Sequence, residues 1–198
     1  MPFEVYTLTG RWVQLEPLVE AHLEPLRIAA ADERIWQHAM EIARGPTFDV
    51  WFDQAISERD AGRRIPFSIR HLSDGRLIGS TSYLDVVERH KRVEIGSTWY
   101  SHEFWGTAIN PECKLLLLRH AFDVFGVNRL AFITDRLNER SQAAIAKLGA
   151  VREGIFRNHM VVQEGRLRDS VVFSILAIEW PEVREKLEER LLNLQSKS

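Results

Sequence analysis

The sequence has almost no cysteine and no long apolar run. Cys113 is the only cysteine among 198 residues, which excludes an internal disulfide and a cysteine-rich zinc site. No segment approaches the roughly 20 consecutive apolar residues of a membrane-spanning helix. Residues 1–10 also lack the basic and apolar regions of a secretory leader. We therefore expect a cytoplasmic protein that does not engage a membrane.

The sequence also lacks an excess of charge of either sign. Lys and Arg number 26 against 28 Asp and Glu, so the formal net charge is −2. This balance does not favour nucleic acid as the main partner. The histidines show no spacing that is typical of metal ligands, so we expect no metal site.

What the sequence does contain is the composition of an ordinary globular protein. Hydrophobic residues make up 45% and charged residues 27% of the chain. No linker, repeat or low-complexity segment interrupts it. We expect residues 1–198 to form a single domain, with a core over about 10–180 and a C-terminal helix over about 181–193.

The order of periodic segments predicts a mixed α/β fold. Strands are predicted over residues 10–16, 65–71, 76–84, 92–100, 129–134, 151–162 and 167–176. Helices are predicted over residues 18–30, 48–61, 111–125, 139–148 and 181–193. Thr47 and Asn110 are the predicted N-caps of the second and third helices.

Residues 95–122 read as a strand, a turn of small residues and a helix. Gly106, Thr107 and Ala108 would let a ligand approach the backbone closely. Asn110 and Pro111 suit the N-cap and first position of the helix that follows. Such a helix start presents unpaired N–H groups, which suit a phosphate or pyrophosphate. The alternative is that the turn needs only small residues and a cap.

Three segments together resemble the GNAT superfamily of N-acetyltransferases. They are WGTAIN before PECKLLLLRHAF, then TDRLNERSQAAIAKLGA, then RNHMVVQEGRLRDSVVFSILAIEWP. The resemblance covers about residues 10–180 and is strongest to the branch of ribosomal-protein N-terminal (alanine/serine) acetyltransferases. It implies a central mixed, mostly antiparallel, splayed β-sheet flanked by helices, and acetyl-CoA as co-substrate.

The resemblance also implies where acetyl-CoA would bind. Pantetheine would pair with the backbone of Thr98, Trp99 and Tyr100, in a splay between the strands near 92–100 and 129–134. The pyrophosphate would meet a run of N–H groups from Trp105, Gly106, Thr107, Ala108, Ile109 and Asn110. The family pattern Gln/Arg-x-x-Gly-x-Gly/Ala falls on Trp105, Ala108 and Asn110, and none of these has the usual type.

Asn138 and Ser141 are candidates at the start of the next helix. Asn138 matches a family asparagine whose amide meets pantetheine, and an N-cap is its alternative role. Many relatives protonate the leaving thiolate from a tyrosine on this helix, but no tyrosine follows Tyr100 here. Ser141 shares a helix face with Asn138. We expect it to contact the cofactor and hydrogen-bond the thiolate or hold a water, a solvated serine being the alternative.

Glu94 is the predicted general base. On a regular strand it shares a face with Gly96, Thr98 and Tyr100, where it could take the ammonium proton directly or through water. An ordinary surface glutamate is the competing interpretation. His159, which changes charge near neutral pH, is predicted to contact the acceptor first and to act as base second.

The last two predicted strands bring three more charged residues together. If these strands form a hairpin, Arg157, Arg168 and Asp169 fall near one another. We expect an Arg–Asp pair there that fixes the wall of the acceptor site.

The sequence therefore predicts an acetyl-CoA-dependent N-acetyltransferase that works by direct attack of a primary amine in a ternary complex. An acyl-enzyme route has little support, since there is one cysteine and no Ser-His-Asp arrangement. The acceptor would be a peptide or protein N-terminus or a small amine. Two alternatives stay open: transfer of another acyl group such as succinyl, and a non-catalytic CoA-binding module. Both a monomer and a homodimer are compatible with the sequence.

Overall fold

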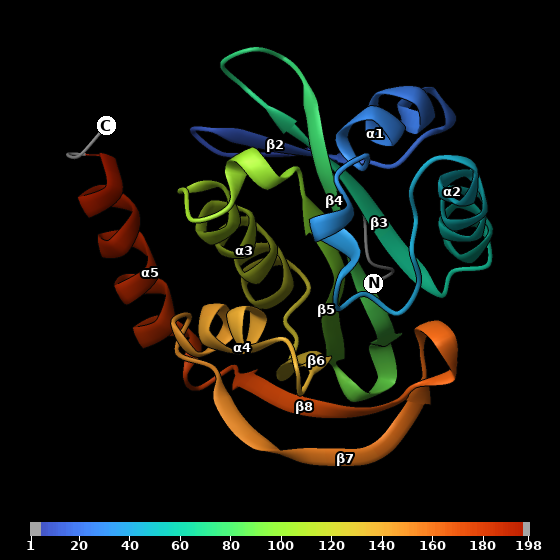
Figure 1. Ribbon diagram of the computed structural model, residues 1–198. Coiled ribbons are helices and arrows are strands. Elements are labelled where there is room, and N and C mark those ends of the chain that lie inside the picture. The colour runs from blue at the N-terminus through green and yellow to red at the C-terminus, as the bar shows by residue number, and fades with distance from the viewer. Residues whose placement is uncertain (1–4, 196–198) are drawn as a thin grey trace.

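Eight strands form one sheet in the part of the chain that the computed structural model describes, residues 5–195. Their order along the sheet is β1-β2-β3-β4-β5-β6-β8-β7, and the sheet curves towards its β7–β8 end (Figure 1). Within these residues only the β5–β6 pair is parallel. The strands are β1 (Leu8–Thr9), β2 (Val13–Pro17), β3 (Arg64–His71), β4 (Leu77–Val87), β5 (Arg92–Tyr100), β6 (Arg129–Asp135), β7 (Val151–Val161) and β8 (Leu167–Leu176).

Five α-helices in the described range flank this sheet. They are α1 (Leu23–Ala29), α2 (Pro46–Asp60), α3 (Ile109–Arg119), α4 (Glu139–Ala146) and α5 (Trp180–Gln195). One π-helical turn, His120–Val124, continues α3. Short 3-10 turns lie at Glu20–His22, Glu33–Trp36, Glu88–His90, His102–Phe104 and Gln163–Gly165. The predicted mixed α/β fold with a mostly antiparallel sheet is confirmed. The predicted single domain includes residues 1–4 and 196–198, which lie outside the described residues.

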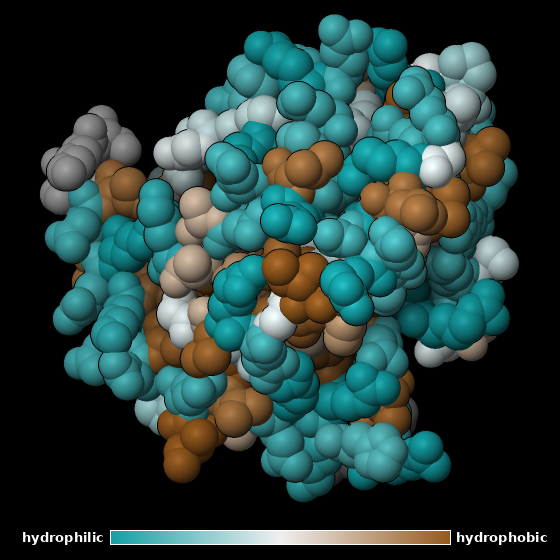
Figure 2. Space-filling model, turned by 60° about the horizontal axis from the view of Figure 1, so that its bottom comes forward, coloured by the Kyte–Doolittle hydropathy of each residue, from teal (hydrophilic) through white to brown (hydrophobic). Residues whose placement is uncertain are grey.

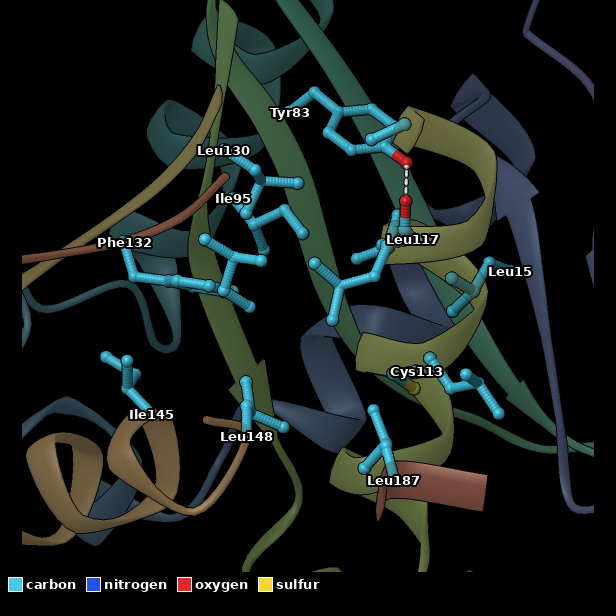
Figure 3. Close-up of a cluster of buried hydrophobic side chains, with 14 of the residues drawn as sticks. Leu15, Tyr83, Ile95, Cys113, Leu117, Leu130, Phe132, Ile145, Leu148 and Leu187 are labelled. Atoms are coloured by element: carbon cyan, nitrogen blue, oxygen red, sulfur yellow. Dashed lines mark hydrogen bonds between the residues drawn. The ribbon is translucent and has the colours of Figure 1, made fainter. Parts of the chain in front are cut away.

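Two buried hydrophobic clusters lie on opposite faces of the sheet. The larger one joins the sheet to α3, α4 and α5, and we call this side the α3 face; Figure 3 shows Leu117 of α3, Phe132 of β6 and Ile145 of α4 there. In the same view Tyr83 of β4 donates a hydrogen bond of 2.6 Å to the carbonyl oxygen of Leu117. The second cluster joins the other side, the α1/α2 face, to side chains of α1 and α2. Strands β4 and β5 therefore contribute side chains to both clusters.

Strand β7 lies at the open edge of the sheet, and most of its side chains are exposed. Figure 2, with the lower end of Figure 1 turned forward, shows hydrophobic patches separated by hydrophilic surface. Within residues 5–195, no helix combines the length and the apolar character that crossing a membrane requires.

The two predicted N-caps are wrong. Helix α2 begins at Pro46 after Gly45, and the Thr47 hydroxyl hydrogen-bonds to backbone of the preceding loop instead. Helix α3 begins at Ile109, so Asn110 lies inside its first turn and its Oδ1 accepts a hydrogen bond of 3.1 Å from the Tyr100 hydroxyl. In both cases a glycine with positive φ, Gly45 or Gly106, turns the chain into the helix earlier than the cap residue type indicates.

Candidate active site

Strands β5 and β6 diverge in the middle of the sheet. Their parallel pairing runs from Arg92↔Arg129 to Glu94↔Ala131 and then stops, although β5 continues to Tyr100 and β6 to Asp135. The strand divergence predicted between residues 92–100 and 129–134 is thus present. The facing backbone of β5 from Gly96 onward is left without a strand partner on this side, so an extended ligand could pair with it.

A β-bulge at Ser97 changes which face the end of β5 presents. The register with β4 shifts between Ser80↔Trp99 and Ser82↔Gly96, and Ser97 has φ of 47°. Arg64 of β3, which is buried, donates a hydrogen bond of 2.7 Å to the Ser97 hydroxyl and so ties the bulge to the α1/α2 face. An extra residue in one strand reverses the alternation of every side chain that follows.

The predicted face of Glu94 is therefore partly wrong. Val93 and Ile95 belong to the cluster of the α3 face, so Glu94 between them points to the α1/α2 face. Beyond the bulge, Tyr100 lies on the α3 face and Trp99 on the α1/α2 face. Glu94 thus shares its face with Trp99 rather than with Tyr100, because the bulge adds one residue between them.

Glu94 lies at the last pair before the strand divergence, and its environment favours the protonated form. Burial raises the pKa of Glu94 to about 7, and Asp85 adds to this while the positive charge of Arg168 opposes it. A carboxylate with a pKa close to neutral can accept a proton from an amine and release it to water. A strongly shifted carboxyl group at a break in the sheet is a candidate functional residue.

The predicted Arg–Asp pair of the last hairpin does not involve Arg168. The charge of Arg157 does act on Asp169, but no direct ion pair joins these two residues in the described part of the chain. Arg168 lies buried on the face of Glu94 and interacts electrostatically with Asp135 and Glu94. Asp169, the next residue, points the other way: it accepts hydrogen bonds from the Asn158 N–H at 2.9 Å and from Arg136 at 3.3 Å. Consecutive residues of a strand face opposite sides, which the sequence argument overlooked.

His159 extends the wall of this site on β7. Its Nδ1 lies 3.0 Å from the hydroxyl of Ser170, a buried β8 residue on the same face as Arg168. The ring also packs on Phe156 at a centroid distance of 5.1 Å. His159 is thus on the side of the sheet that carries Glu94, and its side chain remains largely exposed.

The turn before α3 offers the predicted N–H groups only in part. The Trp105 N–H is already bonded to the His102 carbonyl oxygen at 3.1 Å, and the Ile109 N–H to the Thr107 hydroxyl at 3.3 Å. Among the described residues, the N–H groups of Gly106, Thr107 and Ala108 have no partner. Together with the positive end of α3, they suit an anion.

The residues of this turn differ from the family pattern, but two features still suit an anion. Ala108 has φ of −69°, so an alanine fits where the family pattern has glycine. The guanidinium of Arg140, from the first turn of α4, lies 3.1 Å from the centroid of the Trp105 ring. This cation–π contact brings a positive charge to the turn from another element.

Asn138 is the N-cap of α4, which is one of the two roles that the sequence allows. The Asn138 side chain accepts a hydrogen bond of 2.9 Å from the Ser141 N–H and is the N-cap. This contact uses the side-chain oxygen, so the amide nitrogen is still able to donate to a ligand. Ser141 is partly exposed at the same helix start.

Sequence reasoning missed Lys114, which lies buried on α3. Its Nζ donates a hydrogen bond of 3.0 Å to the hydroxyl of Thr98 on β5. A lysine inside an otherwise apolar helical run, CKLLLL, is a signal that could have found it. No group of three or more His, Cys, Asp or Glu side chains within residues 5–195 is arranged to hold a metal ion.

Comparison with known sequences connects this geometry to a family. The sequence profile described as "Acetyltransferase (GNAT) domain" matches residues 13–151. The Bacillus subtilis (strain 168) protein named "Putative ribosomal N-acetyltransferase YdaF" is 33% identical over 109 residues, which are 55% of this chain and 58% of that protein. The chain thus spans less than two thirds of the length of this curated relative.

Solved structures share nearly the whole fold. A GCN5-related N-acetyltransferase from Brucella melitensis superposes with a TM-score of 0.88 at 28% identity, covering 95% of this chain and 86% of that chain. Mycobacterium smegmatis RimJ, solved in complex with CoA-disulfide, superposes with a TM-score of 0.75 at 21% identity, covering 93% and 91%.

Proposed function

Because the chain belongs to the GNAT acetyltransferase family, we propose that it is an N-acetyltransferase that moves an acetyl group from acetyl-CoA to a primary amine. The amine attacks the thioester directly while both substrates are bound. The same proposal includes a single domain that acts in the cytoplasm, as a monomer or homodimer, without a metal and without nucleic acid as partner.

The observation that carries the proposal is the position of Glu94. It lies half-buried at the last β5–β6 pair before the strand divergence, and desolvation is the main cause that raises its pKa to about 7. A base at this point can take the proton of an amine that approaches from the α1/α2 face, while the donor thioester lies in the divergence.

The turn before α3 supports the same donor. In our proposal the free N–H groups of Gly106, Thr107 and Ala108 bind the pyrophosphate, and Arg140, held on Trp105, adds a positive charge. Asn138 then meets pantetheine through its amide nitrogen, and the backbone of Thr98 to Tyr100 pairs with the pantetheine amides. The structure of RimJ with CoA-disulfide supports a coenzyme A donor on this fold.

For the acceptor we propose a peptide or protein N-terminus, with small amines as the alternative. The names of the relatives, a ribosomal N-acetyltransferase and RimJ, favour this class. His159, exposed on the face of Glu94, would contact the acceptor first and serve as base second. Ser141 would hydrogen-bond the thiolate or hold a water near it.

Binding and turnover measured together test this function. Isothermal titration should detect acetyl-CoA binding, and a thiol-release assay over peptides with different first residues and small amines should detect transfer. Tight binding without turnover for any acceptor would favour a non-catalytic CoA-binding module. Faster transfer from succinyl-CoA than from acetyl-CoA would favour another acyl donor, and no binding would contradict both enzymatic functions.

A further inference from the structure

Lys114 places a buried positive charge beside the strand divergence. Its side chain is only 6% exposed, and its Nζ lies 3.0 Å from the hydroxyl of Thr98 and 5.9 Å from the ring centroid of Phe132. Thr98 belongs to β5 and Phe132 to β6, and both come after the last parallel pair. Figure 3 shows Phe132 on the α3 face, which is the face opposite Glu94.

No carboxylate within the described residues forms an ion pair with this ammonium. The nearest carboxylate in sequence, Glu112, accepts backbone N–H groups of Arg11, Trp12 and Val13. A buried cation without an anion is costly, and a ligand that brings negative charge to this place would offset that cost. The Thr98 hydroxyl, which also contacts the Thr81 hydroxyl at 2.7 Å, accepts only one of the three N–H groups of the ammonium.

During acetyl transfer, negative charge develops on the leaving sulfur of the thioester, which in the proposed function lies in the strand divergence. When an amine displaces a thiol from its thioester, the leaving sulfur must receive a proton. No tyrosine follows Tyr100, and the hydroxyl of Ser141 is a weak acid at neutral pH. Arg168, the buried cation on the other side, lies on the face of Glu94, and a guanidinium is a far weaker acid than an ammonium.

We propose that Lys114 is the general acid that protonates the leaving coenzyme sulfur, an inference that rests on the proposed acetyl transfer. Written from the neutral amine, the nitrogen lone pair forms the N–C bond, and the pair of the C–S bond leaves with sulfur. The proton on nitrogen passes to Glu94, and one Nζ proton of Lys114 passes to sulfur. The amide and the free thiol leave, and one proton moving through solvent from Glu94 to Lys114 restores both side chains.

The pKa of Lys114 suits proton donation to the leaving sulfur. Burial lowers the pKa of Lys114 to about 8, and the adjacent Cys113 thiol opposes the shift. A thiol has a pKa of about 8.5, so the proton transfer is close to balanced. The groups that face the ammonium from β5 and β6, Thr98 and Phe132, are uncharged and do not titrate in this range.

The test compares Lys114→Met with Lys147→Met, an exposed lysine that caps the far end of α4. Lys114→Met should lower kcat with acetyl-CoA by about 100-fold or more, with Kd for CoA changed less than threefold in titration calorimetry. Its Tm should rise, because methionine fills the same space without a buried charge. Lys147→Met should behave as the wild type, and Lys114→Arg should stay impaired since arginine is too weak an acid.

The pH profile separates proton donation from a structural role. In the wild type kcat should fall as the pH rises through about 8, where Lys114 loses its proton, and Lys114→Met should lack this limb. A kcat within twofold of wild type, an unchanged alkaline limb, or a defect with succinyl-CoA but not acetyl-CoA would overturn the assignment. Absence of turnover in the wild type would overturn the proposed function as well.

Discussion

At the scale of one residue, the proposed role of Glu94 as general base is tested by replacing its carboxylate with the amide of glutamine. A base must be unprotonated, so kcat/KM of the wild type should rise about tenfold per pH unit up to about pH 7, following the raised pKa of Glu94, and should fall again above about pH 8, where Lys114 loses its proton. Glu94→Gln should lower kcat by about 100-fold and abolish this rise. Rates measured from pH 5 to 9 check both, with Glu88→Gln, a change at an exposed residue of the preceding turn, as control.

The same variant has a predicted effect on stability. The folded pKa of Glu94 is raised above the ordinary value of 4.5, so its contribution to stability is greatest below pH 4.5 and is lost as the pH rises through 7. Glu94→Gln should therefore raise the free energy of unfolding by about 2 kcal/mol at pH 8 and much less at pH 5. A loss of both activity and stability at pH 8 would instead indicate misfolding.

At the scale of an element, the turn before α3 depends on Gly106. Its φ of 78° lies in the left-handed region, where a side chain is strained although no atom would clash with a Cβ. Gly106→Ala should cost about 1 kcal/mol of stability, and the altered turn should misdirect the N–H groups that bind an anion. We expect Kd for acetyl-CoA to rise about tenfold in titration calorimetry.

Gly154 on β7 is the matched control for this change. It also has open space around it, but its φ is not positive. Gly154→Ala should leave acetyl-CoA binding unchanged. Equal affinity of both variants and the wild type would show that the turn does not hold the coenzyme.

The starts of helices α3 and α4 show that residue type alone does not identify an N-cap. Asn138 is predicted as a possible N-cap and is one, since its side chain accepts a hydrogen bond from the Ser141 N–H. Asn110 has the same residue type but hydrogen-bonds to the Tyr100 hydroxyl from inside α3. The difference arises from a contact between residues of two elements, which the local pattern of the helix start does not contain.

At the scale of the whole molecule, Glu112 joins the site helix to the N-terminal strands. Its carboxylate accepts hydrogen bonds from the N–H groups of Arg11, Trp12 and Val13 at 2.7 to 2.9 Å. Gly10 leaves the space for it, since a Cβ there would lie 2.5 Å from the Glu112 Cδ. Residues 100 positions apart are thus held by one buried side chain.

Replacing this carboxylate should destabilise the fold. Glu112→Gln puts an NH₂ group against backbone donors, so at least one buried N–H loses its partner and the free energy of unfolding should fall by about 2 kcal/mol. Urea unfolding followed by circular dichroism measures the change. Glu103→Gln, at an exposed glutamate before α3, should change it by less than about 0.5 kcal/mol. Equal midpoints for the two variants would contradict the proposed anchoring role.

Much of the fold followed from the sequence. The meander over residues 65–100, the two βα units and the final hairpin are present, and Gly62 and Gly126 follow their helices with positive φ. The GNAT resemblance, including that to proteins named as ribosomal acetyltransferases, is confirmed. The short strand β1 was missed, since two residues carry no periodicity.

By itself the sequence determined the elements, their order and the family, because periodicity, turn residues and motifs act over a few neighbouring positions. Only the tertiary structure decided the chemistry of the site. The bulge at Ser97, held by Arg64 from β3, sets the face that Trp99 and Tyr100 present relative to Glu94. The burial of Glu94 and Lys114 on opposite faces of the strand divergence likewise comes from packing between distant segments, and pKa depends on that packing rather than on residue type.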